Sequence, residues 1–420
     1  MNRLGLNLQI LLAAILGVGI GLWMQSMGTD NPTVAAGLYA SGIVGGIFVD
    51  LLKMVLIPLV FSSIAVGIAN LQGHGQIGRV WKLTLAYFVL TMMIAVFLAM
   101  LFSNLFKPGV GMNVALFADA MAGYHAEQLT LTQFLAQFLG GLFVNPFAAF
   151  AQNNVLAVVV FALFVGVALV VGGTRYRQMH RLLQEFLDLT LHIVGWIMML
   201  APLGIMALLI KLTATQDMAV FASLGKFVAI VAGTTLLHGF IVLPLVLYVV
   251  TRVRPWVFFR GVRDALITAF ATSSSAATLP ITLRCVEQNL GVRRDIAGFV
   301  IPLGATINMD GTALYEAAAA LFIANLVGIE LNLVQQAIIF LTAMIAAMGA
   351  PGIPSAGMVT MVMVLQAVGL PAEAIAILLP IDRALDTFRT TVNVEGDMVG
   401  SLVVDKLVNG GPAAAESRLA

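Results

Sequence analysis

A stripe of polar side chains runs along the last hydrophobic segment of the chain. Its members are Asp382, Asp386, Arg389, Thr390, Asn393 and Asp397. At about 100° per residue in an α-helix, these positions share an arc of roughly 100°. A guanidinium offers a planar fork of donors that fits a carboxylate, and a carboxylate one turn away suits an ammonium group. The stripe therefore predicts a site for a zwitterion that carries a second carboxylate.

The same residues have plainer interpretations. Arg383 lies at the edge of the arc, where it and Asp382 could form an interfacial pair at the mouth of the helix. Asp386 and Arg389 could form only a structural ion pair between helices. Glu395 points away from the arc, and we expect it to be solvated or to contact a scaffold.

A second polar interruption lies in the preceding apolar segment, where the sequence reads Asn-Met-Asp-Gly-Thr at 308–312, followed by Glu316. Ionisable groups within a membrane span are costly and mark a pathway or a site. Gly311 and its polar neighbours should loosen the helix and release carbonyl oxygens, the hard ligands that an alkali cation needs. Asp310 would supply the compensating charge.

The composition requires a membrane to hold these elements. Of 420 residues, 60% are hydrophobic and 10% are charged, with a mean hydropathy of +1.02. A soluble protein would be about a quarter charged, and this length suffices for about eight spans. With a net charge of +1 we expect no nucleic-acid partner, and one cysteine excludes an internal disulfide framework. We interpret the first apolar run, 7–27, as a span rather than a cleaved signal peptide.

Lysines and arginines predict the topology. The connections near 79–82, 175–181 and 252–263 are rich in them, and the connections between are poor. The positive-inside rule puts the rich connections and the N-terminus in the cytoplasm, and the last span ends near Lys406 on the same side.

Two later segments do not fit simple crossings. Residues 264–283 have arginines on both flanks, and the small, hydroxyl-rich stretch Ala271–Pro280 lies in their middle. Residues 333–370 have no Lys or Arg and turn at Gly349–Gly357. We expect two re-entrant hairpins, one from each side, since irregular backbone at membrane depth survives only inside protein or beside water. Each is followed by a polar-interrupted helix, the inverted-repeat pattern of many secondary transporters, although the serines at 273–275 could also be mere packing residues.

Four segments, taken in order, resemble signatures of the dicarboxylate/amino acid:cation symporter family, which includes the excitatory amino acid transporters. They are ATSSSAATLP at 271–280, NMDGTALYE at 308–316, GIP at 352–354 and RTTVNV at 389–394. The resemblance covers nearly the whole chain and is densest from Ala271 to Lys406.

The resemblance implies an all-α polytopic membrane protein with eight transmembrane helices, two re-entrant helical hairpins and inverted repeats, assembled as a homotrimer. A mobile transport domain would move like an elevator past a static scaffold. The scaffold would comprise 1–80 (spans 1–2) and 108–215 (spans 4–5), and the transport domain 81–107 (span 3) and 216–410, followed by a cytoplasmic tail, 411–420. Within 216–410 we expect span 6, hairpin 1 at about 257–289, span 7 at about 295–325, hairpin 2 at about 333–370 and span 8 at about 373–408.

The resemblance also implies residue roles. Arg389 would bind the side-chain carboxylate of the substrate, Asp386 its amino group, and Ser275 with Asn393 its main-chain carboxylate. The rest of the pocket would comprise Ser273, Thr312, Ile353, Gly357 and Thr390. Glu316 matches the acidic position of a proton carrier.

Sodium ions are the implied co-transported species, with no organic cofactor. The first site would use Gly304, Asn308, Asn393 and Asp397. The second would use backbone oxygens of Thr306, Ala347, Met348 and Ala350. The third would use Thr91, Asn308 and Asp310. Relatives with this third site resemble a pattern with Tyr and Ser or Thr around Thr91, whereas Phe88 and Met92 here supply no oxygen.

We therefore expect sodium-driven uptake of glutamate or aspartate across the inner cell membrane, with a proton on Glu316 as a further option. Both termini would be cytoplasmic, and membrane lipids would surround the trimer. A C4-dicarboxylate carrier is disfavoured by Asp386, which would repel a substrate without an ammonium group. A neutral amino acid carrier would leave Arg389 as an unpaired buried charge, and a proton-driven glutamate symporter is a further alternative.

Two other classes have less support. An intramembrane hydrolase could use Ser273–Ser275 or a dyad of Asp310 and Asp382, but all five histidines precede the site region, so a general base is missing. We therefore expect no enzyme. A passive channel would not accumulate its solute against a gradient.

Overall fold

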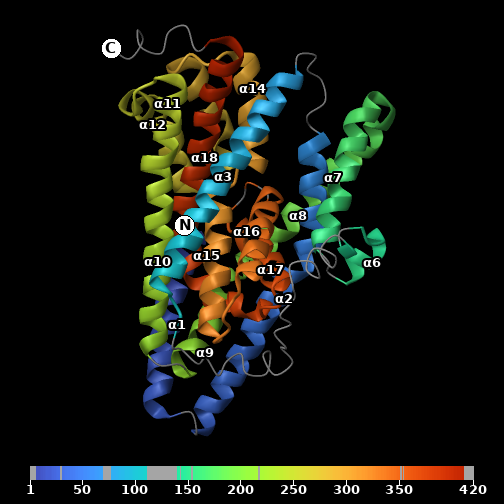
Figure 1. The fold of residues 1–420 in the computed structure, drawn as a ribbon. Coiled ribbons are helices and arrows are strands. Elements are labelled where there is room, and N and C mark those ends of the chain that lie inside the picture. Colours follow the sequence, from blue (N-terminus) through green and yellow to red (C-terminus); the bar gives the residue numbers. More distant parts are fainter. Residues whose placement is uncertain are drawn as a thin grey trace, which may run out of the picture.

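The computed structural model describes residues 6–28, 31–69, 77–110, 140–141, 143–152, 155–215, 218–350, 352 and 354–410. Every regular element in these residues is a helix (Figure 1). The expected all-α architecture is confirmed.

The N-terminal helices form one packed group. Its members are α1 (Leu6–Met27), α2 (Pro32–Ala69), α6 (Pro146–Ala151), α7 (Val155–Gly172), η2 (Gly173–Tyr176), α8 (Arg177–Met199) and α9 (Ala201–Thr215). α1 packs along α9, and α2 packs against α7, α8 and α9. The approach of α1 is close, because a Cβ added at Gly17 would lie 2.8 Å from the Met206 carbonyl oxygen. Small residues are what allows membrane helices to pack at such distances.

A second group surrounds the polar segments. It contains α3 (Ile77–Phe106), α10 (Met218–Leu237), the π-turn η3 (His238–Val242) and α11 (Leu243–Thr251), together with all later helices. η3 joins α10 to α11 without a loop, so the three form one long helix with a local bulge, a feature often found at functional sites.

Hairpin 1 consists of α12 (Pro255–Thr272), α13 (Ser275–Arg284) and the π-turn η4 (Cys285–Asn289). Its tip turns at Ser273, whose φ of 50° is left-handed. Ser274 then caps α13, since its side chain accepts a hydrogen bond from the Ala277 amide at 3.2 Å.

Hairpin 2 consists of α16 (Leu333–Met348) and α17 (Ala356–Ala367). A capping box between Asn332 and Gln335 begins α16. Ser355, with φ of 59°, precedes α17 and ends the tip.

The two polar-interrupted segments follow the hairpins. α14 (Arg294–Ile307) and α15 (Asp310–Leu326) are separated by Asn308 and Met309, where the helical dihedral angles break. η5 (Ala372–Ile377) leads into the long α18 (Leu379–Asn409).

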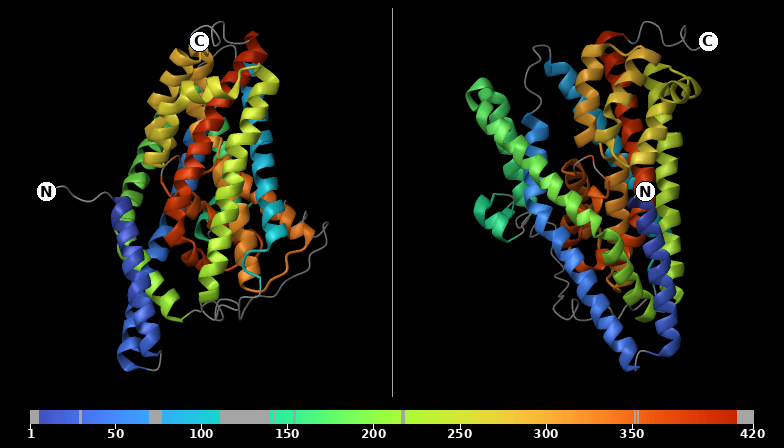
Figure 2. Two further views of the ribbon diagram at one scale, coloured as in Figure 1. Left: turned by 90° about the vertical axis from the view of Figure 1, so that its left-hand side faces the viewer. Right: turned by 180° about the vertical axis from the view of Figure 1, so that it is seen from behind.

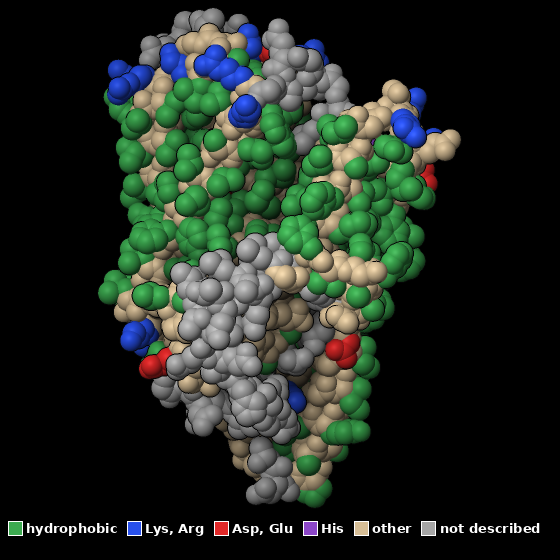
Figure 3. Space-filling model, turned by 45° about the vertical axis from the view of Figure 1, so that its right-hand side comes forward, with side chains coloured by type: hydrophobic (Ala, Val, Ile, Leu, Met, Phe, Trp, Pro, Cys, Tyr) green, Lys and Arg blue, Asp and Glu red, His purple; other side chains and the backbone are tan. Residues whose placement is uncertain are grey.

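The hairpins approach each other from opposite ends of the molecule (Figures 1 and 2). α12 begins at the end where most visible Lys and Arg side chains gather, and apolar side chains cover the surface below (Figure 3). By length and apolar composition, three stretches of the described helices can cross a membrane, Arg79–Phe106, Val160–Ile197 and Ala222–Thr251. The division into scaffold and transport domain remains a prediction, and part of 108–215 and the tail 411–420 lie outside the described residues.

Candidate functional site

The two hairpin tips meet at Gly352. The Ser274 hydroxyl donates to the Gly352 carbonyl at 2.8 Å, and the Ala276 amide donates to the same oxygen at 3.1 Å. A Cβ at position 352 would lie 2.6 Å from the Ala305 carbonyl oxygen, so a glycine is required for this approach.

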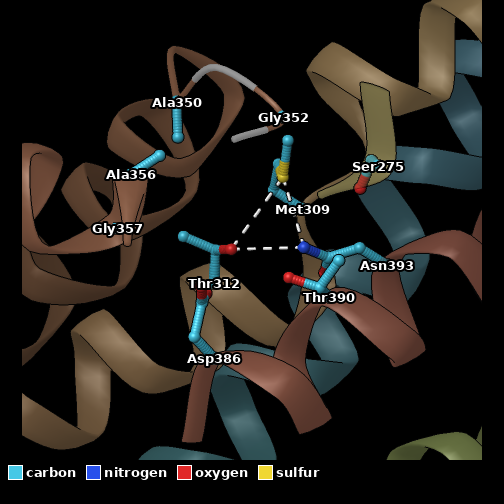
Figure 4. A pocket seen from close by; sticks show the side chains of 10 residues that line it. All are labelled: Ser275, Met309, Thr312, Ala350, Gly352, Ala356, Gly357, Asp386, Thr390 and Asn393. Carbon is cyan, nitrogen blue, oxygen red and sulfur yellow. Dashed lines mark hydrogen bonds between the residues drawn. The ribbon is translucent and has the colours of Figure 1, made fainter. Parts of the chain in front are cut away.

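A small polar pocket lies beneath the joined tips (Figure 4). It is lined by Ser275, Met309, Thr312, Ala350, Gly352, Ala356, Gly357, Asp386, Thr390 and Asn393. These residues come from hairpin 1, the α14–α15 break, hairpin 2 and α18, so four segments far apart in the sequence converge here. Most of the predicted substrate residues are among them. Ser273 is buried at the tip of hairpin 1 without lining the pocket, and Ile353 lies outside the described residues.

Arg389 lies behind this pocket and is 1% exposed. Its Nη2 donates to Asp382 Oδ1 at 2.7 Å and to Asp386 Oδ1 at 2.9 Å, and its guanidinium lies 3.9 Å from the Tyr315 ring centroid. Nε and Nη1 have no hydrogen-bond partner among the described residues. A Cβ added at Gly357 would lie 3.6 Å from Nη1, so one end of the fork is fixed and the other faces hairpin 2.

Asp386 connects α18 to hairpin 2. Its Oδ2 accepts the Ser355 amide at 2.8 Å and Arg383 Nη1 at 3.4 Å. The alternative of an interfacial pair between Asp382 and Arg383 is not supported, because Asp382 is buried and accepts from Arg389. The contact between Asp386 and Arg389 lies within one helix, not between helices.

The α14–α15 break is held against α18 by two asparagines. Asn393 Oδ1 accepts the Gly311 amide at 2.8 Å, and its Nδ2 donates to Thr312 Oγ1 at 3.2 Å. Asn308 Nδ2 donates to Asp397 Oδ1 at 2.9 Å, and the buried Asn308 Oδ1 has no described partner. A side chain at Gly304 would collide with Asp397. Carboxylate, amide and helix-end oxygens thus lie together, which is the donor set of an alkali cation site.

The residues predicted for a second sodium ion end two helices. Thr306 lies in the last turn of α14, and Ala347, Met348 and Ala350 lie at the C-terminus of α16, which packs against α14. The last carbonyl groups of a helix lack intrahelical donors and carry partial negative charge. Ala350 also lines the pocket.

The third predicted site has an unexpected occupant. Fully buried Asp310 accepts Thr91 Oγ1 at 3.3 Å through Oδ1, and its Oδ2 lies 2.8 Å from His238 Nε2. Phe88 and Met92 are buried beside Thr91 on α3 without offering oxygen. The histidines were expected to lie away from the site because they precede it in the sequence, and this is wrong for His238, which η3 brings to Asp310. An ionisable residue in a predicted span was the signal that could have identified it.

The surroundings of Glu395 also differ from those predicted. It is 4% exposed, and a Cβ added at Gly239 of η3 would lie 3.0 Å from its Oε2. It is not solvated, because it is buried and faces η3, which belongs to the second group of helices.

Glu316 lies close to hairpin 2, since a Cβ added at Gly357 would lie 3.9 Å from its Oε1. It is fully buried on α15, and its Oε1 accepts a hydrogen bond from Thr360 of α17. Thr360 and Tyr315 are buried site neighbours that the sequence did not single out, because both look like ordinary residues of apolar helices.

The chain is similar to known proteins over nearly its whole length. The profile of the sodium:dicarboxylate symporter family matches residues 6–407. The chain is 35% identical over 443 residues to excitatory amino acid transporter 3 of Homo sapiens, covering 94% of this chain and 84% of the relative. It is 36% identical over 435 residues to excitatory amino acid transporter 4 of Rattus norvegicus, covering 86% and 77%. It is 34% identical over 450 residues to neutral amino acid transporter B(0) of Mus musculus, covering 96% and 81%.

Proposed function

The chain belongs to the sodium:dicarboxylate symporter family, and we propose that it takes up glutamate and aspartate by symport with sodium. Its relatives are transporters of amino acids, and its apolar helices are those of a multi-pass membrane protein. The broader function, sodium-coupled amino acid transport, follows from the family. The acidic substrate is our proposal.

The observation that carries it is the half-satisfied guanidinium of Arg389. A buried charge whose Nε and Nη1 donors lack partners is costly, and a substrate carboxylate that accepts from Nη1 would lower that cost. Nη1 faces hairpin 2, where the side-chain carboxylate of an acidic amino acid would lie.

The remaining groups suit the other end of the substrate. Asp386, which would hold the amino group, lines the pocket, as do Ser275 and Asn393, which would hold the main-chain carboxylate. Thr312 and Thr390 add hydroxyl groups to the same lining. The Ser355–Asp386 hydrogen bond is one contact that substrate entry would have to break or share.

Sodium coupling is supported by the oxygen-rich break between α14 and α15. Asn308, Asn393 and Asp397, with the backbone of Gly304, would hold the first ion, and the helix ends at Thr306 and Ala347–Ala350 the second. At the third position Asp310 already has His238 as a partner. We propose two sodium ions, with Glu316 as the proton carrier.

The same proposal includes the assembly. The group formed by α1, α2 and α6–α9 would be the scaffold of a homotrimer, and α3 with α10–α18 the moving transport domain. The protein would lie in the inner cell membrane among lipids, with both termini and the basic end of Figure 3 in the cytoplasm.

Uptake into liposomes by the purified protein tests the substrate and the ion separately. Labelled glutamate and aspartate should accumulate against their gradients when sodium is higher outside, and succinate should not compete. Uptake driven by a pH gradient alone would contradict the sodium assignment.

Neutral amino acids are the second candidate substrates. Asp382 and Asp386 already neutralise part of the Arg389 charge, and one relative is named a neutral amino acid transporter. Serine and glutamine therefore belong in the same assay, and stronger competition by them than by aspartate would favour this candidate.

A further inference from the structure

Among the described residues, Thr360 makes the side-chain hydrogen bond between hairpin 2 and Glu316. Its hydroxyl donates to Glu316 Oε1, and both residues are buried, Thr360 to 1% exposure and Glu316 completely. The other carboxyl oxygen, Oε2, has no hydrogen-bond partner among the described residues. The Thr360 hydroxyl is therefore the group on α17 that contacts the Glu316 carboxyl group on α15.

The Thr360 hydroxyl also has alternative acceptors. The carbonyl oxygens of Ala356 and Gly357, in the preceding turn of α17, each lie 3.4 Å from its Oγ1. A hydroxyl has a single proton to donate but can accept as well. When Glu316 is ionised, only Thr360 can supply the proton of their hydrogen bond. When Glu316 is protonated, the carboxyl can donate to Thr360, whose own proton then turns to its helix.

The first turn of α17 connects this contact to the tip of hairpin 2. Ser355, the residue before α17, donates its amide to Asp386 at 2.8 Å, and Gly357 lines the pocket. A Cβ added at Gly357 would lie 3.9 Å from Glu316 Oε1. The first turn of α17 thus lies between the Ser355–Asp386 hydrogen bond, which holds the tip, and the carboxyl group of Glu316.

The charged surroundings of Glu316 are simple. Among the described residues, the guanidinium of Arg389 on α18 is the charge that acts on this carboxyl, and Arg389 is itself engaged by Asp382 and Asp386 through Nη2. The hydroxyl of Thr360 on α17 is its hydrogen-bond partner. A change of charge on Glu316 therefore alters its hydrogen bond to α17 and its electrostatic interaction with Arg389.

We propose that Thr360 is a positioning residue that couples the protonation of Glu316 to the closure of hairpin 2. This rests on the proposed role of Glu316 as the proton carrier. An ionised carboxylate receives the stronger, charge-assisted hydrogen bond and holds α17 against α15, whereas protonation weakens that hold and frees the tip to move.

The test measures tip opening directly. A Ser355→Cys substitution in a Cys285→Ala background places one thiol on the tip, and its labelling by a membrane-impermeant maleimide is followed in proteoliposomes from about pH 5 to pH 9. Because maleimide reacts with the thiolate, whose fraction rises with pH, each rate is divided by the rate for the same protein unfolded in denaturant at that pH, and this ratio is the labelling rate compared below. In this parent we expect labelling to be slower at high pH by about tenfold, the usual effect of a hydrogen bond to a charged group. Thr360→Val should remove the pH dependence, and Thr360→Ser should keep it.

Thr342→Val is the matched control. Thr342 is also buried in hairpin 2, at 1% exposure, but its hydroxyl donates to the Ile338 and Ile339 carbonyl groups of its own helix. It should leave the pH dependence of labelling unchanged. Glu316→Gln, which keeps the size of the side chain and cannot ionise, should abolish that dependence even if Thr360→Val is not recovered.

Two results overturn the proposal: labelling that is independent of pH in the parent, or a pH dependence that survives in Thr360→Val or Glu316→Gln. Sodium-driven glutamate uptake by the parent at one fixed pH is measured in parallel. Failure of that uptake contradicts the proposed substrate, whereas failure of the labelling pattern alone contradicts the role of Thr360.

Discussion

His238 Nε2 lies 2.8 Å from Asp310 Oδ2, and neither side chain is exposed. The pair joins the π-turn between α10 and α11 to the first residue of α15. Asp310 is one of the ligands expected for a third sodium ion, and here its carboxyl group has a protein side chain as its partner.

Replacing His238 by Gln should therefore lower the thermal stability of the protein and increase the stabilisation that added sodium provides. Leaving the buried Asp310 carboxyl group without this hydrogen-bond partner typically costs about 1–3 kcal/mol. Free sodium can compensate the charge of Asp310, so thermal unfolding of His238→Gln should shift more with added sodium than that of the natural protein. His192→Gln, on α8 outside the site, is the control, and equal sodium responses in both variants would contradict the prediction.

Replacing Arg389 by Cys should remove the preference for acidic substrates. The lost charge-assisted hydrogen bonds are worth about 1.5–3 kcal/mol each, or at least tenfold in the ratio of aspartate to serine uptake. The ratio is measured by competition in proteoliposomes. Asp382→Asn, which keeps the guanidinium and removes one of its partners, should retain the acidic preference. If the Arg389→Cys variant still prefers aspartate to serine, Arg389 does not bind the side-chain carboxylate of the substrate.

Gly352→Ala should abolish uptake by separating the hairpin tips. The added Cβ would lie 2.6 Å from the backbone oxygen of Ala305, which cannot move aside as a flexible side chain can. Gly298→Ala on α14, where no atom lies within 4 Å of the added Cβ, should transport normally. Uptake by Gly352→Ala at the level of Gly298→Ala would mean that the tips need not meet at this glycine.

Much of the site followed from periodicity. The 3.6-residue period placed Asp386, Thr390 and Asn393 on one face of the last helix, and all three line the pocket. The asymmetry of Lys and Arg predicted both hairpins, because the flanks of a re-entrant segment return to the same side.

The sequence did not reveal the contacts that depend on which helices pack against one another. Periodicity shows which residues share a face of a helix, but not which helix covers that face. Glu395 was expected to be solvated or to contact a scaffold because it lies opposite the polar stripe, yet it is buried and faces η3. His238 is 72 positions from Asp310, and the hydroxyl of Thr360 resembles any helix threonine until α15 is placed beside it.

Asp397→Asn should raise the sodium concentration needed for half-maximal uptake. The substitution preserves the shape of the side chain and an oxygen that can still accept from Asn308 Nδ2, so the packing of α18 against the α14–α15 break is retained. The negative charge that would hold the first ion is lost, and we expect the half-saturating sodium concentration to rise by about tenfold or more. Asp405→Asn is the matched control, because Asp405 is buried on the same helix but pairs with Arg293, so its loss should affect stability and leave the sodium requirement unchanged. Uptake is measured over a series of sodium concentrations at saturating aspartate. A sodium requirement that rises equally in both variants would point to a general weakening of α18, whereas a rise confined to Asp397→Asn places the ion at the helix break.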